Sequence, residues 1–156
     1  MMHHTILTCH VKKDWVDYNQ HMNDAAYARV FSLAVEKLMN KIGIDQSFRH
    51  TYEYSIFTLE THICYLKEAR EGESLRITFQ LLDHDEKRLH VFFTMYNKDS
   101  EEVATSEQML MGMDMKQGRP SPFPSPIAQK TEDMANKQTD LSYPKRAGRQ
   151  IGIRQK

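Results

Sequence analysis

A short stretch near the start of the chain, from Asp14 to Tyr27, carries several side chains that can do chemistry. Asp17, His21 and Asn23 place a carboxylate, an imidazole and a carboxamide close together there. A helix that begins directly after them would present backbone N–H groups that have no intrahelical partner and carry a partial positive charge. Such a helix end can polarise a carbonyl or hold an oxyanion, while a neighbouring carboxylate attacks or activates water. The stretch therefore has the residue types that chemistry on a carbonyl group requires.

The same residues also have a purely structural interpretation. Asp17 can shape a turn, Asn23 or Asp24 can cap a helix, and His21 can lie on the surface. Spacing alone does not decide between this interpretation and a reactive site.

One long helix is predicted directly after this stretch. Apolar residues recur at three- and four-residue spacing from Tyr27 to Ile42, which describes a single apolar stripe. Asn23 or Asp24 is the expected N-cap, and Gly43 is the expected end of the helix.

The remaining regular elements are predicted to be strands. One strand, Thr5 to Val11, precedes the loop, and the later runs alternate with period two. Short polar turns between these runs favour antiparallel hairpins. The expected fold is α+β, an antiparallel sheet of about five strands packed on one long helix. Met109, Met111, Met113 and Met115 are expected to fill gaps against the helix or a partner subunit.

The composition excludes several classes of partner. Lys and Arg together number 21, as do Asp and Glu, so no net charge favours nucleic acid or an anionic membrane. Cys9 and Cys64 are expected to be reduced thiols of a cytoplasmic protein. His62 and His90 have no partner at metal-ligand spacing, so no metal site is predicted. No segment has the length of a membrane span, and none is predicted.

The chain is predicted to contain one main domain, residues 1–118, and an extension, residues 119–156. The extension begins with a proline-rich segment and continues with a stretch that favours one polar helix. Its last part is expected to be a mobile tail.

The pattern W-x-D-x3-H-x-N-[ND]-x2-Y, which begins at Trp15 and ends at Tyr27, resembles a known family. It looks like the hotdog-fold thioesterases related to 4-hydroxybenzoyl-CoA thioesterase, in which an antiparallel sheet wraps a central helix. The predicted order of elements matches that architecture over about residues 4 to 115.

A narrower resemblance is to the betainyl-CoA thioesterase group, also found fused to carnitine 3-dehydrogenases. It is carried by VDYNQHMNDAAY, FTLETHICYLKEAREGE, LLDHDEKRLHVFFTM, ATSEQMLMGMD and GRPSPFP. Gln20 stands where that loop usually has glycine, so a loop of different shape is expected. Gly112 stands where histidine is expected, which would remove a polar group from the site.

The resemblance implies a thioester hydrolase whose substrate is an acyl-CoA with a short polar acyl group, such as betainyl-CoA. The carbonyl would rest over the start of the helix, and Asp17 would act as the nucleophile or general base. An anhydride intermediate and direct attack by water both remain open. His21 would orient water or protonate the leaving thiolate, and Asn23 would hold the loop or the water.

The remaining site residues are expectations about the substrate. Glu60, with aromatic rings, is expected to recognise a quaternary ammonium, which gains only charge attraction and cation–π contact. Lys87 and Arg88 are expected to bind the CoA phosphates. The full predicted substrate-binding set is Trp15, Tyr18, Asp24, Tyr27, Glu60 and His62.

Two other functions remain open alongside this one. The chain is alternatively a thioesterase for another acyl-CoA or for an acyl carrier protein, or a non-catalytic ligand-binding subunit of the same fold. No cofactor is expected beyond the CoA of the substrate. The expected assembly is a homodimer or a tetramer of dimers.

Overall fold

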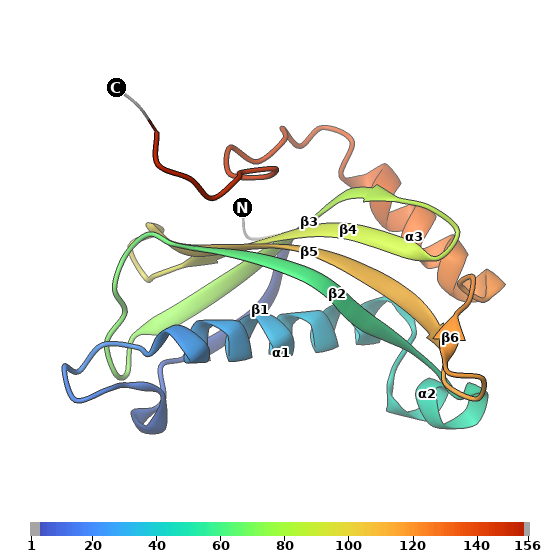
Figure 1. The fold of residues 1–156 in the computed structure, drawn as a ribbon, viewed down its shortest axis with the longest axis horizontal. Coiled ribbons are helices and arrows are strands. Elements are labelled where there is room, and N and C mark those ends of the chain that lie inside the picture. Colours follow the sequence, from blue (N-terminus) through green and yellow to red (C-terminus); the bar gives the residue numbers. More distant parts are fainter. Residues whose placement is uncertain (1–3, 155–156) are drawn as a thin grey trace.

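The computed structural model describes residues 4–154. A long helix, α1, lies beneath a curled antiparallel sheet (Figure 1). A single 3-10 turn (Lys13–Trp15) stands between the first strand and this helix. In chain order the labelled elements are β1 (Thr5–His10), α1 (Asp24–Ile42), α2 (Gln46–Tyr52), β2 (Tyr54–Tyr65), β3 (Ser74–His84), β4 (Arg88–Tyr96), β5 (Glu102–Asp114), β6 (Arg119–Pro120) and α3 (Ser125–Lys137).

Helix α1 begins and ends where the sequence predicts. The side-chain oxygen of Asn23 accepts a hydrogen bond from the amide of Ala25 at 2.8 Å, which caps the first turn. Gly43 ends the helix with a φ of 101°, a conformation that costs little without a β-carbon. The buried residues confirm the predicted apolar stripe and are Ala26, Tyr27, Val30, Phe31, Ala34, Val35, Leu38 and Ile42.

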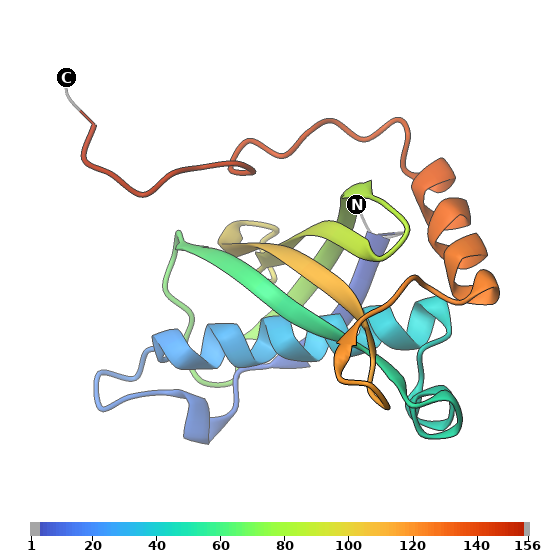
Figure 2. The ribbon, with the colours of Figure 1, turned by 45° about the vertical axis from the view of Figure 1, so that its right-hand side comes forward.

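The sheet has the strand order β1-β3-β4-β5-β2, and all neighbouring strands are antiparallel. Figure 2 shows that it curls around α1. Leu75, Phe93 and Leu110 are among the fully buried side chains that pack with the helix in the core. Strand β2 stands at one edge, with β5 as its only strand neighbour in the described chain. The predicted α+β fold, a sheet wrapped around one helix, is therefore confirmed.

The methionines of β5 do not pack with α1 in the core as the sequence predicts; Met113 is buried but outside the core cluster, and packing against a partner subunit stays a prediction. Leu110 is fully buried in the core, whereas Met109 and Met111 are half-buried on the opposite face of the strand. Met115 is exposed. Both alternating sets of β5 contain apolar residues, so period two alone does not reveal which set faces the helix.

Helix α2 occupies a stretch whose sequence has no clear periodic pattern. Asp45 caps it by accepting a hydrogen bond from the amide of Phe48 at 2.8 Å. The helix lies on the same side of the sheet as α1 and leads directly into the edge strand β2 (Figure 1). It therefore places its last residue, Tyr52, at the start of that edge.

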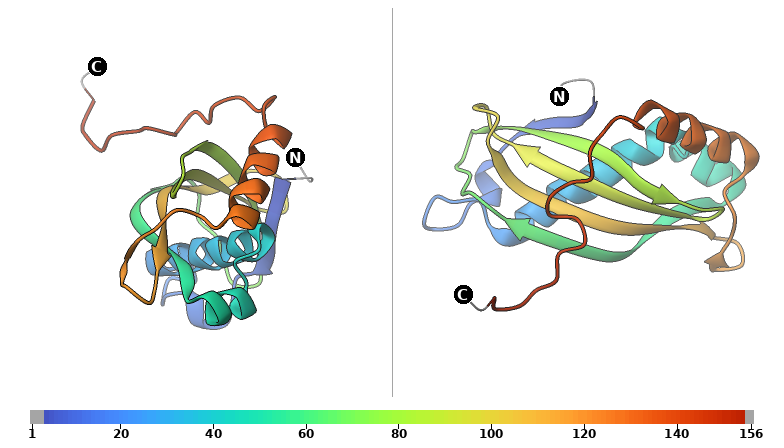
Figure 3. Two further views of the ribbon diagram at one scale, coloured as in Figure 1. Left: turned by 90° about the vertical axis from the view of Figure 1, so that its right-hand side faces the viewer. Right: turned by 90° about the horizontal axis from the view of Figure 1, so that it is seen from above.

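The carboxyl-terminal extension lies against the main body. The predicted helix in it is confirmed as α3, whose Ile127 and Thr131 are buried. The following segment crosses the outer face of the sheet toward the β2 edge (Figure 3). It is held there by a bond from the Gln80 side chain to the Ser142 carbonyl, 3.1 Å, and by one from the Gly148 amide to Glu107, 2.7 Å. The division into residues 1–118 and 119–156 stays a prediction.

Candidate active site

The loop between β1 and α1 folds back on itself as a small hairpin. The amide of Asp17 donates to the carbonyl of His21, and the amide of Gln20 donates to the carbonyl of Asp17, both at 2.9 Å. Gln20 has a φ of 69°, so it adopts the positive φ that glycine usually supplies. The cost is on the order of 1 kcal/mol for a residue with a β-carbon. Gln20 therefore takes a positive φ despite its β-carbon, and a difference in loop shape from the family stays a prediction.

The Asp17 carboxylate is partly buried and fixed through one of its oxygens. Its Oδ1 accepts hydrogen bonds from the amides of Asn19 at 2.9 Å and His21 at 3.4 Å. Its Oδ2 has no hydrogen-bond partner in the protein within residues 4–154. The turn therefore orients the carboxylate and leaves one oxygen available for reaction.

Backbone contacts join this hairpin to the loop after β2. The amide of Met22 donates to the carbonyl of Ala69 at 2.7 Å, and His21 pairs with Arg70 in a β-bridge. The ring nitrogen Nε2 of His21 lies 3.2 Å from the carboxylate of Glu68. These contacts place the loop after β2 beside Asp17.

The first turn of α1 presents backbone amides that have no intrahelical acceptor. The Ala25 amide donates to both Asn23 Oδ1 and Asp24 Oδ1, and the Ala26 amide donates to the Asn23 carbonyl. The Asp24 amide has no acceptor among the described residues. Because it lies at the positive end of the helix, it can stabilise a negatively charged oxygen.

These elements surround one open pocket of about 470 Å³. Tyr27 and Tyr65 meet edge to face in its wall, with ring centroids 5.2 Å apart. The Tyr27 hydroxyl donates to the Lys67 carbonyl and the Tyr65 hydroxyl to the Asp24 carbonyl, both at 3.3 Å. Burial raises the pKa of both phenols, so both stay neutral donors at neutral pH. The pocket is lined by Asp17, Asn19, His21, Met22, Asp24, Tyr27, Tyr65, Leu66, Lys67 and Glu68.

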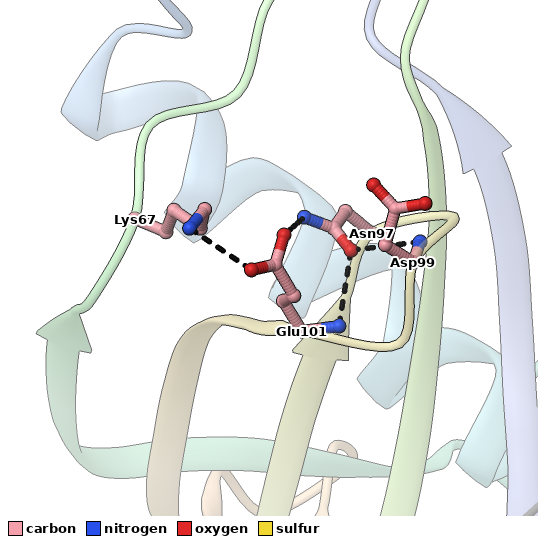
Figure 4. A network of polar contacts seen from close by, with 4 residues as sticks. All are labelled: Lys67, Asn97, Asp99 and Glu101. Atoms are coloured by element: carbon pink, nitrogen blue, oxygen red, sulfur yellow. Dashed lines mark hydrogen bonds and ion pairs between the residues drawn. The ribbon is translucent and has the colours of Figure 1, made fainter.

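The loop that forms one wall is tied to the β4–β5 turn (Figure 4). Lys67 Nζ lies 3.0 Å from Glu101 Oε2, and the Asn97 side-chain amide donates to Glu101 Oε1 at 3.0 Å. The Asn97 side-chain oxygen in turn accepts from the amides of Asp99 and Glu101. The hydrogen bond from Asn97 and then that from Lys67 lower the pKa of Glu101, so the pair stays charged in weak acid. This network supports the wall from outside the pocket.

Four of the predicted site residues thus line one pocket: Asp17, His21, Asp24 and Tyr27. Asn23 caps the helix at the edge of this pocket. Trp15 is buried in the core, 6% exposed, and Tyr18 is 92% exposed. Neither of these two aromatic residues lines the pocket.

Glu60 and His62 lie elsewhere in the protomer. Their register opposite Met109 and Glu107 places them on the outer face of the sheet. There they line a separate cavity of about 240 Å³ that includes His90, whose ring lies 2.6 Å from Glu107. Within one protomer they do not meet Asp17, and their role in binding stays a prediction.

Lys87 lies in the β3–β4 turn and Arg88 begins β4, at the end of the sheet opposite the Asp17 loop (Figure 1). Arg88 already binds Asp85, with Nη2 2.6 Å from Oδ2. That hydrogen bond, with those from the turn amides, lowers the pKa of Asp85 to about 2. Their predicted contact with CoA phosphates is not tested by these positions.

Sequence patterns did not identify the wall contributed by Leu66, Lys67 and Glu68. These residues reach the pocket only because the hairpin pairs with the loop after β2. No local spacing signals such a contact, since it joins segments more than forty positions apart. No group of His, Cys, Asp and Glu within residues 4–154 has the arrangement of a metal site. None of the helices described has both the length and the apolar character needed to cross a membrane.

Comparison with known proteins agrees with this arrangement. Residues 11–131 match the family model of the thioesterase-like superfamily. Betainyl-CoA thioesterase of Pseudomonas aeruginosa is 40% identical over 92% of this chain and 91% of its own length. The L-carnitine dehydrogenase/betainyl-CoA thioesterase of Rhizobium meliloti is 38% identical over 91% of this chain, which matches 29% of that longer protein.

Solved structures are similar over nearly the whole chain. A Staphylococcus aureus protein in complex with CoA has a TM-score of 0.92 and 31% identity, covering 96% of both chains. A putative thioesterase of Pseudomonas putida KT2440 has a TM-score of 0.84 and 33% identity, covering 97% of both chains. With its hotdog architecture and a carboxylate-bearing loop before the central helix, this chain belongs to the thioesterase-like superfamily.

Proposed function

We propose that this chain hydrolyses betainyl-CoA to the free acid and CoA. The observation that carries the proposal is the single pocket that holds the Asp17 carboxylate and the start of α1 together. The identity of 40% with a betainyl-CoA thioesterase supports the choice of acyl group. A short acyl group suits an open pocket of about 470 Å³.

In the proposed reaction the thioester carbonyl lies over the first turn of α1. The Asp24 amide donates to the carbonyl oxygen as negative charge develops on it. Asp17 Oδ2 either attacks the carbonyl carbon, forming a mixed anhydride that water then hydrolyses, or removes a proton from a water that attacks the carbonyl carbon directly. Along both routes the carbon–sulfur bond breaks, and the products are a carboxylate and the CoA thiol.

His21 is proposed to assist this step. Its ring lines the same pocket, and its Nε2 lies near Glu68. An imidazole in this position can orient the attacking water or deliver a proton to the leaving thiolate. Asn23 is proposed to act mainly by capping α1 and so fixing the first turn.

The proposed reaction needs no cofactor, because CoA enters as part of the substrate and water is the other reactant. A cytoplasmic location is proposed with it. What supports that location is that Cys9 and Cys64 are both free thiols.

The proposed assembly is a homodimer formed along β2. This edge strand exposes a continuous run from Phe57 to Thr61, in which Phe57 is 43% and Leu59 54% exposed. An exposed apolar edge with unpaired backbone groups favours pairing with another strand. A second copy supplies a matching strand through two-fold symmetry.

The direct test is a panel of CoA thioesters assayed for release of free thiol. Betainyl-CoA is compared with 3,3-dimethylbutyryl-CoA, which has the same shape but carbon in place of the charged nitrogen. We expect kcat/KM to be at least about tenfold higher for betainyl-CoA, since only the cation gains charge and cation–π attraction. Faster release from the neutral compound, or only from an acylated carrier protein, would overturn the choice of substrate. Release from no thioester would overturn the function.

A further inference from the structure

Tyr52 is a large aromatic side chain that the core does not use. It ends α2 and is 65% exposed. Its ring packs against that of Phe48, with centroids 4.6 Å apart and the planes tilted by 38°, and Phe48 packs against the core. The support of Phe48 holds the Tyr52 ring in place while most of its surface faces solvent.

Within one protomer Tyr52 is far from the candidate active site. Strand β2 separates the two, because α2 leads into its first residue and the wall of the pocket follows its last residue. Figure 3 shows α2 and the loop before α1 at opposite ends of the molecule. Tyr52 can therefore reach a pocket of this kind only in another copy of the chain.

Antiparallel pairing of two β2 strands provides that approach. The exposed run Phe57 to Thr61 has Leu59 at its midpoint. A two-fold axis there, at the bulge that β2 has between Thr58 and Glu60, pairs Tyr54 with the partner's Cys64 and spans nearly the whole strand. Just beyond the paired strands, the same axis sets Leu66, which lines the pocket, beside the partner's Tyr52.

The pocket of one protomer has a single well-exposed aromatic ring, Tyr65, which is 52% exposed. Tyr27, its edge-to-face neighbour, is only 4% exposed. A quaternary ammonium cannot hydrogen-bond and is held best when aromatic faces surround it. Carboxylates line the same pocket at Asp17, Asp24 and Glu68 and add attraction to a cation.

We propose that Tyr52 of one subunit and Tyr65 of the other enclose the trimethylammonium group of the substrate, so that Tyr52 determines acyl specificity across the dimer. This inference rests on the proposed function and on the β2 dimer. It assigns cation recognition to the inner side of the sheet, and not to Glu60 on the outer face.

Tyr52→Leu tests the contribution of the ring. We expect kcat/KM for betainyl-CoA to fall about tenfold, while that for 3,3-dimethylbutyryl-CoA changes less than about twofold. Tyr52→Phe keeps the aromatic face and should keep the preference. Tyr143→Leu is the matched control, because Tyr143 is similarly exposed, 62%, but lies in the carboxyl-terminal extension.

Mixed dimers test whether Tyr52 acts across the interface. Asp17→Asn and Tyr52→Leu proteins are unfolded together in equal amounts and refolded, so that half of the dimers contain one subunit of each. If Tyr52 acts on the site that contains the partner's Asp17, the mixture recovers about a quarter of wild-type kcat/KM for betainyl-CoA. If Tyr52 acts on the site of its own subunit, the mixture recovers about one twentieth of wild-type kcat/KM. Wild-type protein refolded in the same way sets the scale.

The outcomes separate this inference from the proposed function. Three results would overturn the role of Tyr52. These are equal losses of kcat/KM for the two substrates in Tyr52→Leu, no loss of kcat/KM in that variant, or a refolded mixture that recovers only one twentieth of wild-type kcat/KM. In each of these cases wild-type preference for betainyl-CoA would still support the proposed function. Absence of that preference in the wild-type enzyme would overturn both.

Discussion

At the scale of single residues, Gly112 decides how closely Tyr54 packs against β5. A β-carbon at Gly112 would overlap the Tyr54 hydroxyl and lie 3.0 Å from the Ser121 carbonyl, to which that hydroxyl donates. Gly112 does not line the Asp17 pocket. The glycine therefore serves packing, and the histidine expected from the family resemblance would not fit this position.

We predict that Gly112→Ala lowers the free energy of unfolding by roughly 1–3 kcal/mol, because the added methyl group overpacks the site. Tyr54→Phe in the same chain should recover part of that loss, since it removes the overlapping hydroxyl. Gly152→Ala is the control, because nothing lies near its β-carbon position. Urea unfolding of the four proteins measures the effect, and equal stability of Gly112→Ala and wild type would contradict it.

Asn23 makes a different kind of contribution, through the helix cap. Asn23→Ala removes one of two acceptors of the Ala25 amide and should lower the free energy of unfolding by about 0.5–1 kcal/mol. Asn40→Ala, on the exposed side of the same helix away from its start, should leave stability unchanged or slightly higher. Chemical denaturation compares the two variants. A larger loss in Asn40→Ala would contradict the role assigned to the cap.

At the scale of elements, the sequence predicts best where signals are local. Helix α1 carries its apolar stripe and both end signals within twenty-one positions, Asn23 to Gly43, so its bounds follow from the sequence alone. Helix α2 is short, and its single strong signal is the Asp45 cap. The inner face of β5 is not readable, because Leu110 and the flanking methionines are all apolar.

The residues of the pocket also differ in how well the sequence predicts them. Asp17, His21, Asp24 and Tyr27 are close in sequence, so a motif can identify them together. Glu68 reaches the pocket through pairing between distant segments, which no motif records. Glu60 is predicted to bind substrate because its carboxylate suits a cation. Its strand register instead places it on the outer face of the sheet, away from the pocket.

At the scale of the whole molecule, the unpaired edge of β2 predicts that two copies of the chain form a dimer. Leu59→Lys places a charge at the centre of the proposed interface and should convert the dimer to a monomer of 18.4 kDa. Ile151→Lys, at a position 89% exposed in the extension, should remain dimeric. Light scattering at micromolar concentration compares them, and a wild-type monomer would contradict the assembly.

The central claim is that Asp17 acts directly on the thioester carbonyl, and one steady-state measurement tests it. Asp17→Asn keeps the shape of the side chain and its turn-forming acceptor, but an amide is a far poorer nucleophile and base. We predict that kcat for betainyl-CoA falls by about two to four orders of magnitude, while the unfolding midpoint changes little. Folded Asp17→Asn protein that releases thiol at the wild-type rate would contradict the account, and the loop would then be only a helix cap and its preceding turn.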